Sequence, residues 1–162
     1  MDFRSERHFR PAVAEAEARN RAAIEALVPA AEVEHIGSTA VAGVVTKGDM
    51  DLLVRVPAAE FAAACGDLRR RYDVNQPENW ARGFASFTEP DPPGVPVGIQ
   101  LVAAGDDWDR RFMEWRRLLT VDPAVRARYN QLKRDHADSD PGAYLEAKAR
   151  FIAAELGVPP AR

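Results

Sequence analysis

The chain has 162 residues, of which 46% are hydrophobic and 29% are charged, so it suffices for one well-packed domain and is too apolar for wholesale disorder. Its formal net charge of −3 disfavours general nucleic-acid binding, which calls for a basic surface. The single cysteine, Cys65, excludes an intramolecular disulfide and a multi-cysteine metal site. No apolar run approaches the roughly 18 residues of a membrane helix, and the N-terminal residues are too polar for a signal peptide. We therefore expect a cytoplasmic protein without a membrane partner.

The patterns in residues 1–104 predict a mixture of helices and strands. Apolar residues that recur every three or four positions indicate helices, and short runs with one apolar face indicate strands. We predict helices over residues 10–28 and 57–71, a helical turn over 40–43, and strands over 32–38, 49–56, 72–75, 81–88 and 95–103. The last two strands flank a proline-rich loop, so we expect them to form an antiparallel hairpin.

Residues 105–162 carry helix-capping signals. Asp106 or Asp107 begins a helix, and Asp122-Pro123 and Asp140-Pro141 each pair an N-cap residue with a proline in the first helical turn. Gly157 is expected to end the last helix. Because the apolar stripes of these helices need a surface to pack on, we predict a single domain over residues 1–162, with a core over 1–104 and a helical tail over 105–162.

A glycine–serine turn and two aspartates carry the functional signal. Gly37, Ser38 and Thr39 follow a strand, and free backbone N–H groups beside a hydroxyl suit a phosphate. Ten residues after Ser38 come Asp49 and Asp51, which project from the same face of the next strand. Such a pair attracts Mg²⁺, which proteins hold with one or two carboxylates plus substrate phosphates. The alternative is a plain turn, with Asp49 capping the strand entrance.

This pattern resembles the signature of the nucleotidyltransferase superfamily, which has the DNA polymerase β-like fold. More closely, the chain resembles the GrpB family, in the run 35–39, in Val41, Gly43, Lys47 and the strand 51–54, and in Trp115-Arg116, Tyr129, Lys133, Tyr144, Lys148 and Phe151. The resemblance covers nearly the whole chain. It implies an α+β fold, with a mixed nucleotidyltransferase-like sheet flanked by helices against one face and a helical C-terminal half that closes a cleft. The superfamily implies Mg²⁺-dependent nucleotidyl transfer.

The chain departs from the family pattern at several positions. Ala42 and Gly48 replace usual prolines, and Asp49 stands where many members have an aliphatic residue. Gln100 lies on the strand from which active nucleotidyltransferases commonly add a third carboxylate. The absence of that carboxylate weakens the case for catalysis and leaves metal–nucleotide binding intact.

Lysine is rare in this sequence, which has 19 arginines but only Lys47, Lys133 and Lys148. All three are candidate phosphate ligands, because Lys47 precedes the aspartate strand and the resemblance implies that the other two project into the cleft. Lys133 and Lys148 each follow a tyrosine by one helical turn. The alternative is that they are solvated lysines whose stems cover the core.

Two functions of different class are consistent with these residues. The first is a Mg²⁺-dependent nucleotidyltransferase that moves a nucleotidyl group from a nucleoside triphosphate to an unknown small-molecule or protein acceptor. The second is a catalytically silent module that binds a nucleotide or a CoA-type phosphate ligand. In both, Asp51 and then Asp49 are the metal ligands. His35 and Gln100 are candidate substrate contacts, or else a structural histidine and a packed amide.

Overall fold

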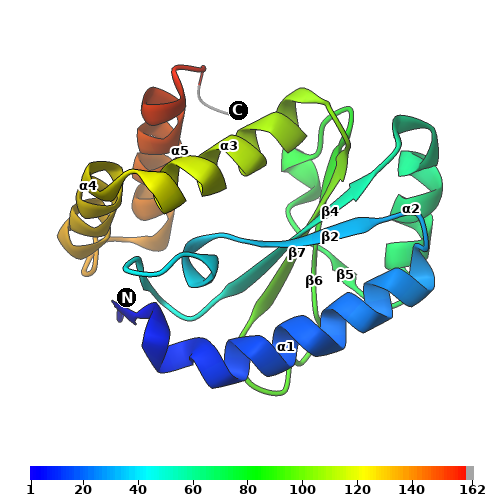
Figure 1. The fold of residues 1–162 in the computed structure, drawn as a ribbon, viewed down its shortest axis with the longest axis horizontal. Coiled ribbons are helices and arrows are strands. Elements are labelled where there is room, and N and C mark those ends of the chain that lie inside the picture. Colours follow the sequence, from blue (N-terminus) through cyan, green and yellow to red (C-terminus); the bar gives the residue numbers. More distant parts are fainter. Residues whose placement is uncertain (160–162) are drawn as a thin grey trace.

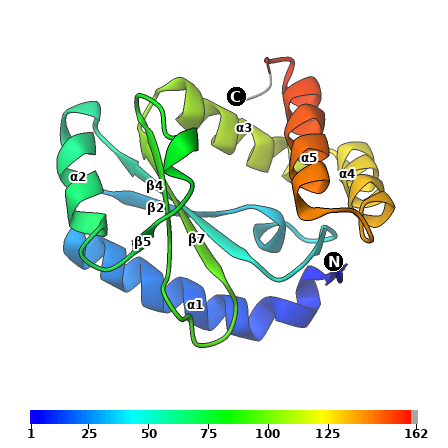
Figure 2. The same ribbon diagram turned by 180° about the vertical axis from the view of Figure 1, so that it is seen from behind.

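The computed structural model describes residues 1–159 and shows a central sheet with helices on both faces (Figures 1 and 2). The helices are α1 (Glu6–Leu27), α2 (Phe61–Leu68), α3 (Asp107–Val121), α4 (Pro123–Asp135) and α5 (Pro141–Leu156), with short 3₁₀ turns η1 (Ser38–Ala40), η2 (Ala58–Glu60) and η3 (Pro77–Asn79). The strands are β1 (Arg4–Ser5), β2 (Glu32–Ile36), β3 (Val45–Thr46), β4 (Met50–Val56), β5 (Asp73–Val74), β6 (Phe84–Thr88) and β7 (Val97–Ala103).

Five strands form a mixed sheet in the order β2-β4-β7-β6-β5, and β1 and β3 form a separate two-stranded ribbon. Only β4 and β7 run parallel in the five-stranded sheet, and its other neighbouring strands are antiparallel. The predicted antiparallel pairing of residues 81–88 with 95–103 is confirmed as β6 and β7. The predicted α+β class with a mixed sheet is likewise confirmed.

Alternation along β4 divides the sheet into two faces. Met50, Leu52 and Val54 are fully buried against α1 and α2, in the largest hydrophobic cluster. Residues at the alternate positions face the other side, where Leu53 packs with Phe112 of α3. Helices therefore cover both faces of the sheet, because α3 of the predicted helical tail lies on the face opposite α1 and α2 (Figures 1 and 2).

The three C-terminal helices pack around a second cluster beyond the sheet. Trp115 of α3, Tyr129 of α4 and Phe151 of α5 meet there, with the Tyr129 and Phe151 rings stacked at 5.8 Å between centroids. Val41 and Val44, from the segment between β2 and β4, complete the cluster. This packing fixes α4 and α5 next to the turn that follows β2.

Several predicted boundaries differ from the structure for local reasons. Helix α1 begins at Glu6 rather than residue 10, because the Ser5 hydroxyl caps it by accepting a hydrogen bond from the Arg7 N–H. Gly37, with φ +77°, turns the chain at once, so the helical turn lies at Ser38–Ala40 and not at 40–43. Gly83, with φ +75°, delays β6 to Phe84. The helix predicted over 57–71 is the 3₁₀ turn η2 followed by α2.

The capping predictions are confirmed for α4 and α5, whereas Asp106 stands at the N-cap position of α3 without a side-chain hydrogen bond that caps the helix. The Asp122 carboxylate accepts hydrogen bonds from the N–H groups of Ala124 and Val125, and Asp140 accepts one from Ala143. Gly157 ends α5 in the left-handed conformation. None of the helices in residues 1–159 combines the length and apolarity that crossing a membrane requires.

Candidate functional site

A cleft of about 380 Å³ opens where the turn after β2 meets the start of β4 and the C-terminal helices. We call it the lysine cleft, because all three lysines of the chain line it, whereas none of the arginines among residues 1–159 does. Its walls are formed by Phe3, Ile36, Gly37, Ser38, Thr46, Lys47, Asp49, Asp51, Asn75, Gln100, Phe112, Trp115, Tyr129, Lys133, Tyr144, Leu145, Lys148 and Ile152.

Sheet register places Asp51 at the centre of this cleft. Strand pairing sets Asp51 opposite Ile36 of β2 on one side and Gly98 of β7 on the other. A Cβ atom at Gly37 would lie 2.7 Å from Asp51 Oδ2, and one at Gly98 would lie 2.6 Å from Oδ1. The carboxylate therefore occupies a slot that only two glycines leave open.

The electrostatics of Asp51 follow from this enclosure. Burial raises the pKa of its carboxyl group, and the nearby Asp49 carboxylate raises it further. The Lys148 ammonium and the Gln100 amide act in the opposite direction. Asp49 is more exposed and forms an ion pair with Lys47, at 2.9 Å between Nζ and Oδ2. A bound cation would therefore relieve the repulsion between the two carboxylates.

Lys133 anchors the turn that follows β2. Its side chain is 1% exposed, and its Nζ donates hydrogen bonds to Ser38 Oγ (2.6 Å) and to the carbonyl oxygen of Val45 (2.5 Å). The same atom lies 4.1 Å from the centroid of the Tyr129 ring. Burial lowers the pKa of Lys133 to about 6, and the positive charges of Lys148 and Lys47 add to this effect. An anion in the cleft would favour its charged form.

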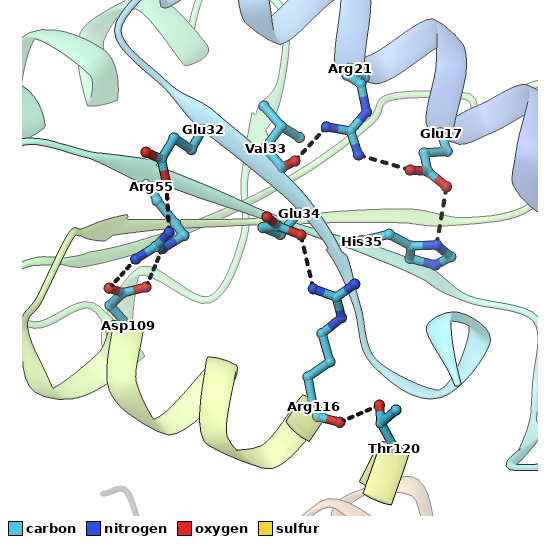
Figure 3. Close-up of polar contacts among 10 residues, drawn as sticks. All are labelled: Glu17, Arg21, Glu32, Val33, Glu34, His35, Arg55, Asp109, Arg116 and Thr120. Carbon is cyan, nitrogen blue, oxygen red and sulfur yellow. Dashed lines mark hydrogen bonds and ion pairs between the residues drawn. The ribbon is translucent and has the colours of Figure 1, made fainter. Parts of the chain in front are cut away.

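A chain of polar contacts supports the turn from the α1 side, and Figure 3 shows its first contact, between Glu17 and His35. Glu17 of α1 lies 3.1 Å from His35 Nδ1, and His35 Nε2 lies 3.0 Å from the Thr39 hydroxyl oxygen. The Thr39 hydroxyl is also 3.2 Å from the carbonyl oxygen of Asp49. Burial lowers the pKa of His35, although Glu17 opposes this shift. The chain thus links α1 to the backbone that carries both the turn and the first aspartate.

Edge strand β2 is held on its other side by ion pairs to α3 and β4 (Figure 3). Arg116 donates to Glu34 at 2.8 Å, and Arg55 donates to Glu32 at 2.6 Å. Arg55 also makes two hydrogen bonds to the buried carboxylate of Asp109. These contacts orient β2, and therefore the turn that follows it.

The structure brings most of the predicted site residues together. Gly37, Ser38, Lys47, Asp49, Asp51, Gln100, Lys133 and Lys148 all line the lysine cleft. Thr39 and His35 do not line it and instead border a separate cavity on the α1 side. The roles of all ten residues stay predictions. Sequence reasoning missed Gly98, although a glycine inside a strand pattern is a signal of close approach.

The side chains of the cleft suit a cation that binds together with a phosphate ligand. They suit a metal site built from protein ligands alone less well. Within residues 1–159 there is no set of three or more His, Cys, Asp and Glu side chains placed to hold a metal ion. Asp49 and Asp51 nonetheless supply the one or two carboxylates with which Mg²⁺ is usually bound alongside substrate phosphates. The slot at Gly37 and Gly98 gives the Asp51 carboxylate the space that a Cβ atom at either position would take.

Known proteins resemble this chain in sequence and in fold. The model of the GrpB protein family matches residues 7–156. A UPF0157 protein of Vibrio cholerae is 32% identical over 134 residues, which are 83% of this chain and 70% of that protein. A UPF0157 protein of Deinococcus radiodurans is 31% identical over 137 residues, covering 83% and 71% respectively.

Two solved structures share the fold at low sequence identity. The conserved protein GrpB from Enterococcus faecalis has a TM-score of 0.63 and 20% identity, over 90% of this chain and 96% of that one. Cid1, an RNA terminal uridylyl transferase, has a TM-score of 0.54 and 17% identity, over 79% of this chain and 40% of Cid1. The chain therefore has a nucleotidyltransferase-like fold.

Proposed function

Because the chain belongs to the GrpB family and has a nucleotidyltransferase-like fold, we propose that it binds a nucleoside triphosphate with Mg²⁺ in the lysine cleft and transfers the nucleotidyl group to an acceptor. One observation supports this most: the three lysines of an otherwise arginine-rich chain converge on the cleft that holds Asp51. Lysine is a compact point charge that suits phosphate, and a chance distribution would not gather all three in one place.

The residues divide into two groups by chemistry. Ser38 and the backbone of its turn, with Lys133 and Lys148, would bind the phosphates. Asp49 and Asp51 would hold Mg²⁺, which supplies charge neutralisation at the phosphate oxygens. In the transfer, an acceptor hydroxyl or amine forms a bond to the α-phosphorus and loses its proton to solvent water, while the bond to the bridging oxygen breaks and pyrophosphate leaves with that electron pair. The lysines stabilise the charge of the departing pyrophosphate.

A second candidate function is a module that binds the same ligand, or a CoA-type phosphate ligand, without transfer. It is favoured by Gln100, which lines the cleft and whose amide cannot serve as a base. Pyrophosphate release that depends on an acceptor and is lost in Asp51→Asn would exclude this module. Transfer that persisted in both Asp49→Asn and Asp51→Asn would instead exclude the mechanism proposed above.

A thermal-shift experiment tests ligand binding. The four nucleoside triphosphates are added with and without Mg²⁺ to the wild type and to Asp51→Asn. A ligand at 100 times its Kd adds about 2.7 kcal/mol of stability, which is a Tm rise of several degrees at this chain length. We expect a Mg²⁺-dependent rise in the wild type and its loss in Asp51→Asn.

The matched control is Asp67→Asn, which removes one carboxylate charge from helix α2, outside the cleft. It should keep the full Mg²⁺-dependent rise. No rise with any nucleotide in the wild type, or an equal rise in Asp51→Asn, would contradict the proposal.

A further inference from the structure

A second cavity of about 330 Å³ lies between helices α3 and α5. We call it the α3–α5 groove. Its α3 wall is aromatic, with Trp108, Phe112 and Trp115, and its α5 wall is largely aliphatic. The α5 side and the residues beyond it contribute Leu145, Lys148, Ala149, Ile152, Ala153, Leu156 and Val158, and the set is completed by Arg111 and Gln76.

The groove is continuous with the lysine cleft. Phe112, Trp115, Leu145, Lys148 and Ile152 line both cavities. Two consecutive residues of one loop also connect the two cavities, since Asn75 lines the cleft and Gln76 lines the groove. One molecule in the groove can therefore present its end to the contents of the cleft, with Lys148 at the junction.

Few polar groups are free to recognise a ligand inside the groove. Besides Lys148, the polar groups are those of Gln76 and Arg111 and the indole N–H groups of Trp108 and Trp115. The Arg111 guanidinium lies 5.6 Å from the Trp108 ring centroid and donates a hydrogen bond to the carbonyl oxygen of Pro159. A nucleobase or a sugar placed here would lose hydrogen bonds to water without regaining them, which is unfavourable. The lining thus suits an apolar group.

An exposed apolar side chain marks the opening. Leu145, which lines both cavities, is 49% exposed, whereas Trp115 on the facing helix is 8% exposed. Covering a leucine side chain is favourable, because its apolar surface leaves water. An apolar ligand seated in the groove would gain part of that free energy.

We propose that the α3–α5 groove binds the apolar body of the acceptor, so that its reactive end lies at the junction beside Lys148 while the nucleotide occupies the lysine cleft. The acceptor is then a small molecule with an aliphatic or aryl body and a terminal hydroxyl or amine, and not a nucleic acid or a sugar. The role of acceptor rests on the proposed function, but the apolar selectivity of the groove does not.

The experiment measures the Kd of 1-butanol, 1-hexanol and 1-octanol by tryptophan fluorescence. Trp80→Phe serves as the background, since Trp108 and Trp115 line the groove and Trp80 does not. Each methylene buried in the groove should strengthen binding about fourfold.

Ala149→Phe, which fills the groove from α5, should abolish this dependence on chain length. Leu145→Gln should weaken the dependence of affinity on chain length. This variant keeps the fold, because the Leu145 side chain is already half-exposed.

The matched control is Val121→Gln, at a 59% exposed position of α3 that lines neither cavity. It should bind each alcohol like the background protein. An affinity that does not rise with chain length, or a rise that persists in Ala149→Phe, would overturn the assignment of the groove.

Competition with ATP separates this inference from the proposed function. Alcohol binding should be unchanged by Asp51→Asn and by saturating ATP with Mg²⁺. Mutual exclusion of ATP and 1-octanol would mean that the nucleotide itself fills the groove, and would overturn the acceptor assignment. Chain-length-dependent binding of alcohols with no binding of any nucleotide would contradict the proposed function and leave only the apolar selectivity of the groove.

Discussion

Gly98 and Asp51 are paired across the parallel strands β7 and β4, and a Cβ atom at Gly98 would lie 2.6 Å from Asp51 Oδ1. Real Cβ atoms do not approach an oxygen so closely, so any other residue at position 98 must displace the carboxylate. Gly98 has no positive φ that would require glycine for conformational reasons. The space for Asp51 therefore explains this glycine, whereas Gly37 also needs its φ of +77°.

Replacing Gly98 by alanine tests whether the position of Asp51 matters for metal binding. The added methyl group pushes Asp51 Oδ1 away while the strand keeps an ordinary conformation. Displaced supporting groups typically cost 10–100-fold in metal affinity, so we expect a loss of about that size in Mg²⁺-dependent nucleotide binding. Calorimetric titration with ATP and Mg²⁺ measures it.

Gly66→Ala is the control for the same chemical change. A Cβ at Gly66 would have nothing within 4 Å, and the residue lies within helix α2. It should leave nucleotide affinity unchanged and stabilise the protein by about 0.5–1 kcal/mol through helix propensity. Equal affinity of Gly98→Ala and the wild type would show that the slot is not needed for binding.

A third carboxylate can be installed at Gln100. Its side chain projects from the same face of the sheet as Asp51, because it lies two positions along β7 from Gly98, the partner of Asp51, and it lines the cleft. Gln100→Glu should raise Mn²⁺ affinity in the absence of nucleotide by at least about tenfold, because each added carboxylate improves an oxygen-ligand site. Without metal the variant should be less stable, since the new charge repels Asp51.

Electron paramagnetic resonance of free Mn²⁺ measures this affinity. Gln131→Glu adds the same charge at an exposed position of α4 and should leave the affinity unchanged. An unaltered Mn²⁺ affinity in Gln100→Glu would mean that position 100 does not face the metal, and would count against the two-carboxylate site.

Much of the fold and part of the site could be predicted from local sequence. The spacing of Gly37-Ser38 and Asp49-Met50-Asp51 predicted a turn followed by a strand, although Asp49 lies just before β4 and only Asp51 lies within it. The resemblance to the GrpB family is confirmed by the family match. Signals such as Asp122-Pro123 gave correct helix starts because a cap depends only on its own neighbours. The two-residue strands β1 and β3 are too short to show any alternation.

The rest of the site depends on contacts between distant segments. Gly98 faces Asp51 only because β4 and β7 are parallel in one particular register, which no local pattern specifies. The pairing of Glu17 with His35 likewise depends on how α1 lies across β2. The α3–α5 groove was not predicted, because the aromatic residues of α3 have the same spacing whether they face a core or a cavity.

The link between Glu17, His35 and Thr39 should stabilise the turn. His35→Ala removes two polar contacts of a mostly buried side chain, so we expect the free energy of unfolding to fall by about 1–3 kcal/mol. In a double-mutant cycle with Glu17→Ala, the two losses should be non-additive, because both remove the same contact. Urea denaturation measures each variant.

His8→Ala provides the comparison for the histidine substitution. His8 is exposed near the start of α1, and its loss should change stability by less than about 0.5 kcal/mol. Strictly additive effects of Glu17→Ala and His35→Ala would show that the contact between Glu17 and His35 contributes nothing to stability.

The buried amine of Lys133 should make stability depend on pH. Its pKa is about 6 in the folded protein, well below that of an exposed lysine, because burial and the neighbouring Lys148 and Lys47 disfavour its charge. Between that value and roughly pH 10 the unfolded chain binds more protons at this residue than the folded protein does. The contribution of Lys133 to stability therefore rises with pH across this window and levels off below about pH 6.

Urea denaturation at several pH values from 6.5 to 9 should show a smaller rise in Lys133→Met than in the wild type. Arg134→Met, at the exposed neighbouring position, should keep the wild-type pH dependence. Identical pH dependence in Lys133→Met and the wild type would mean that the amine is charged in the folded cleft.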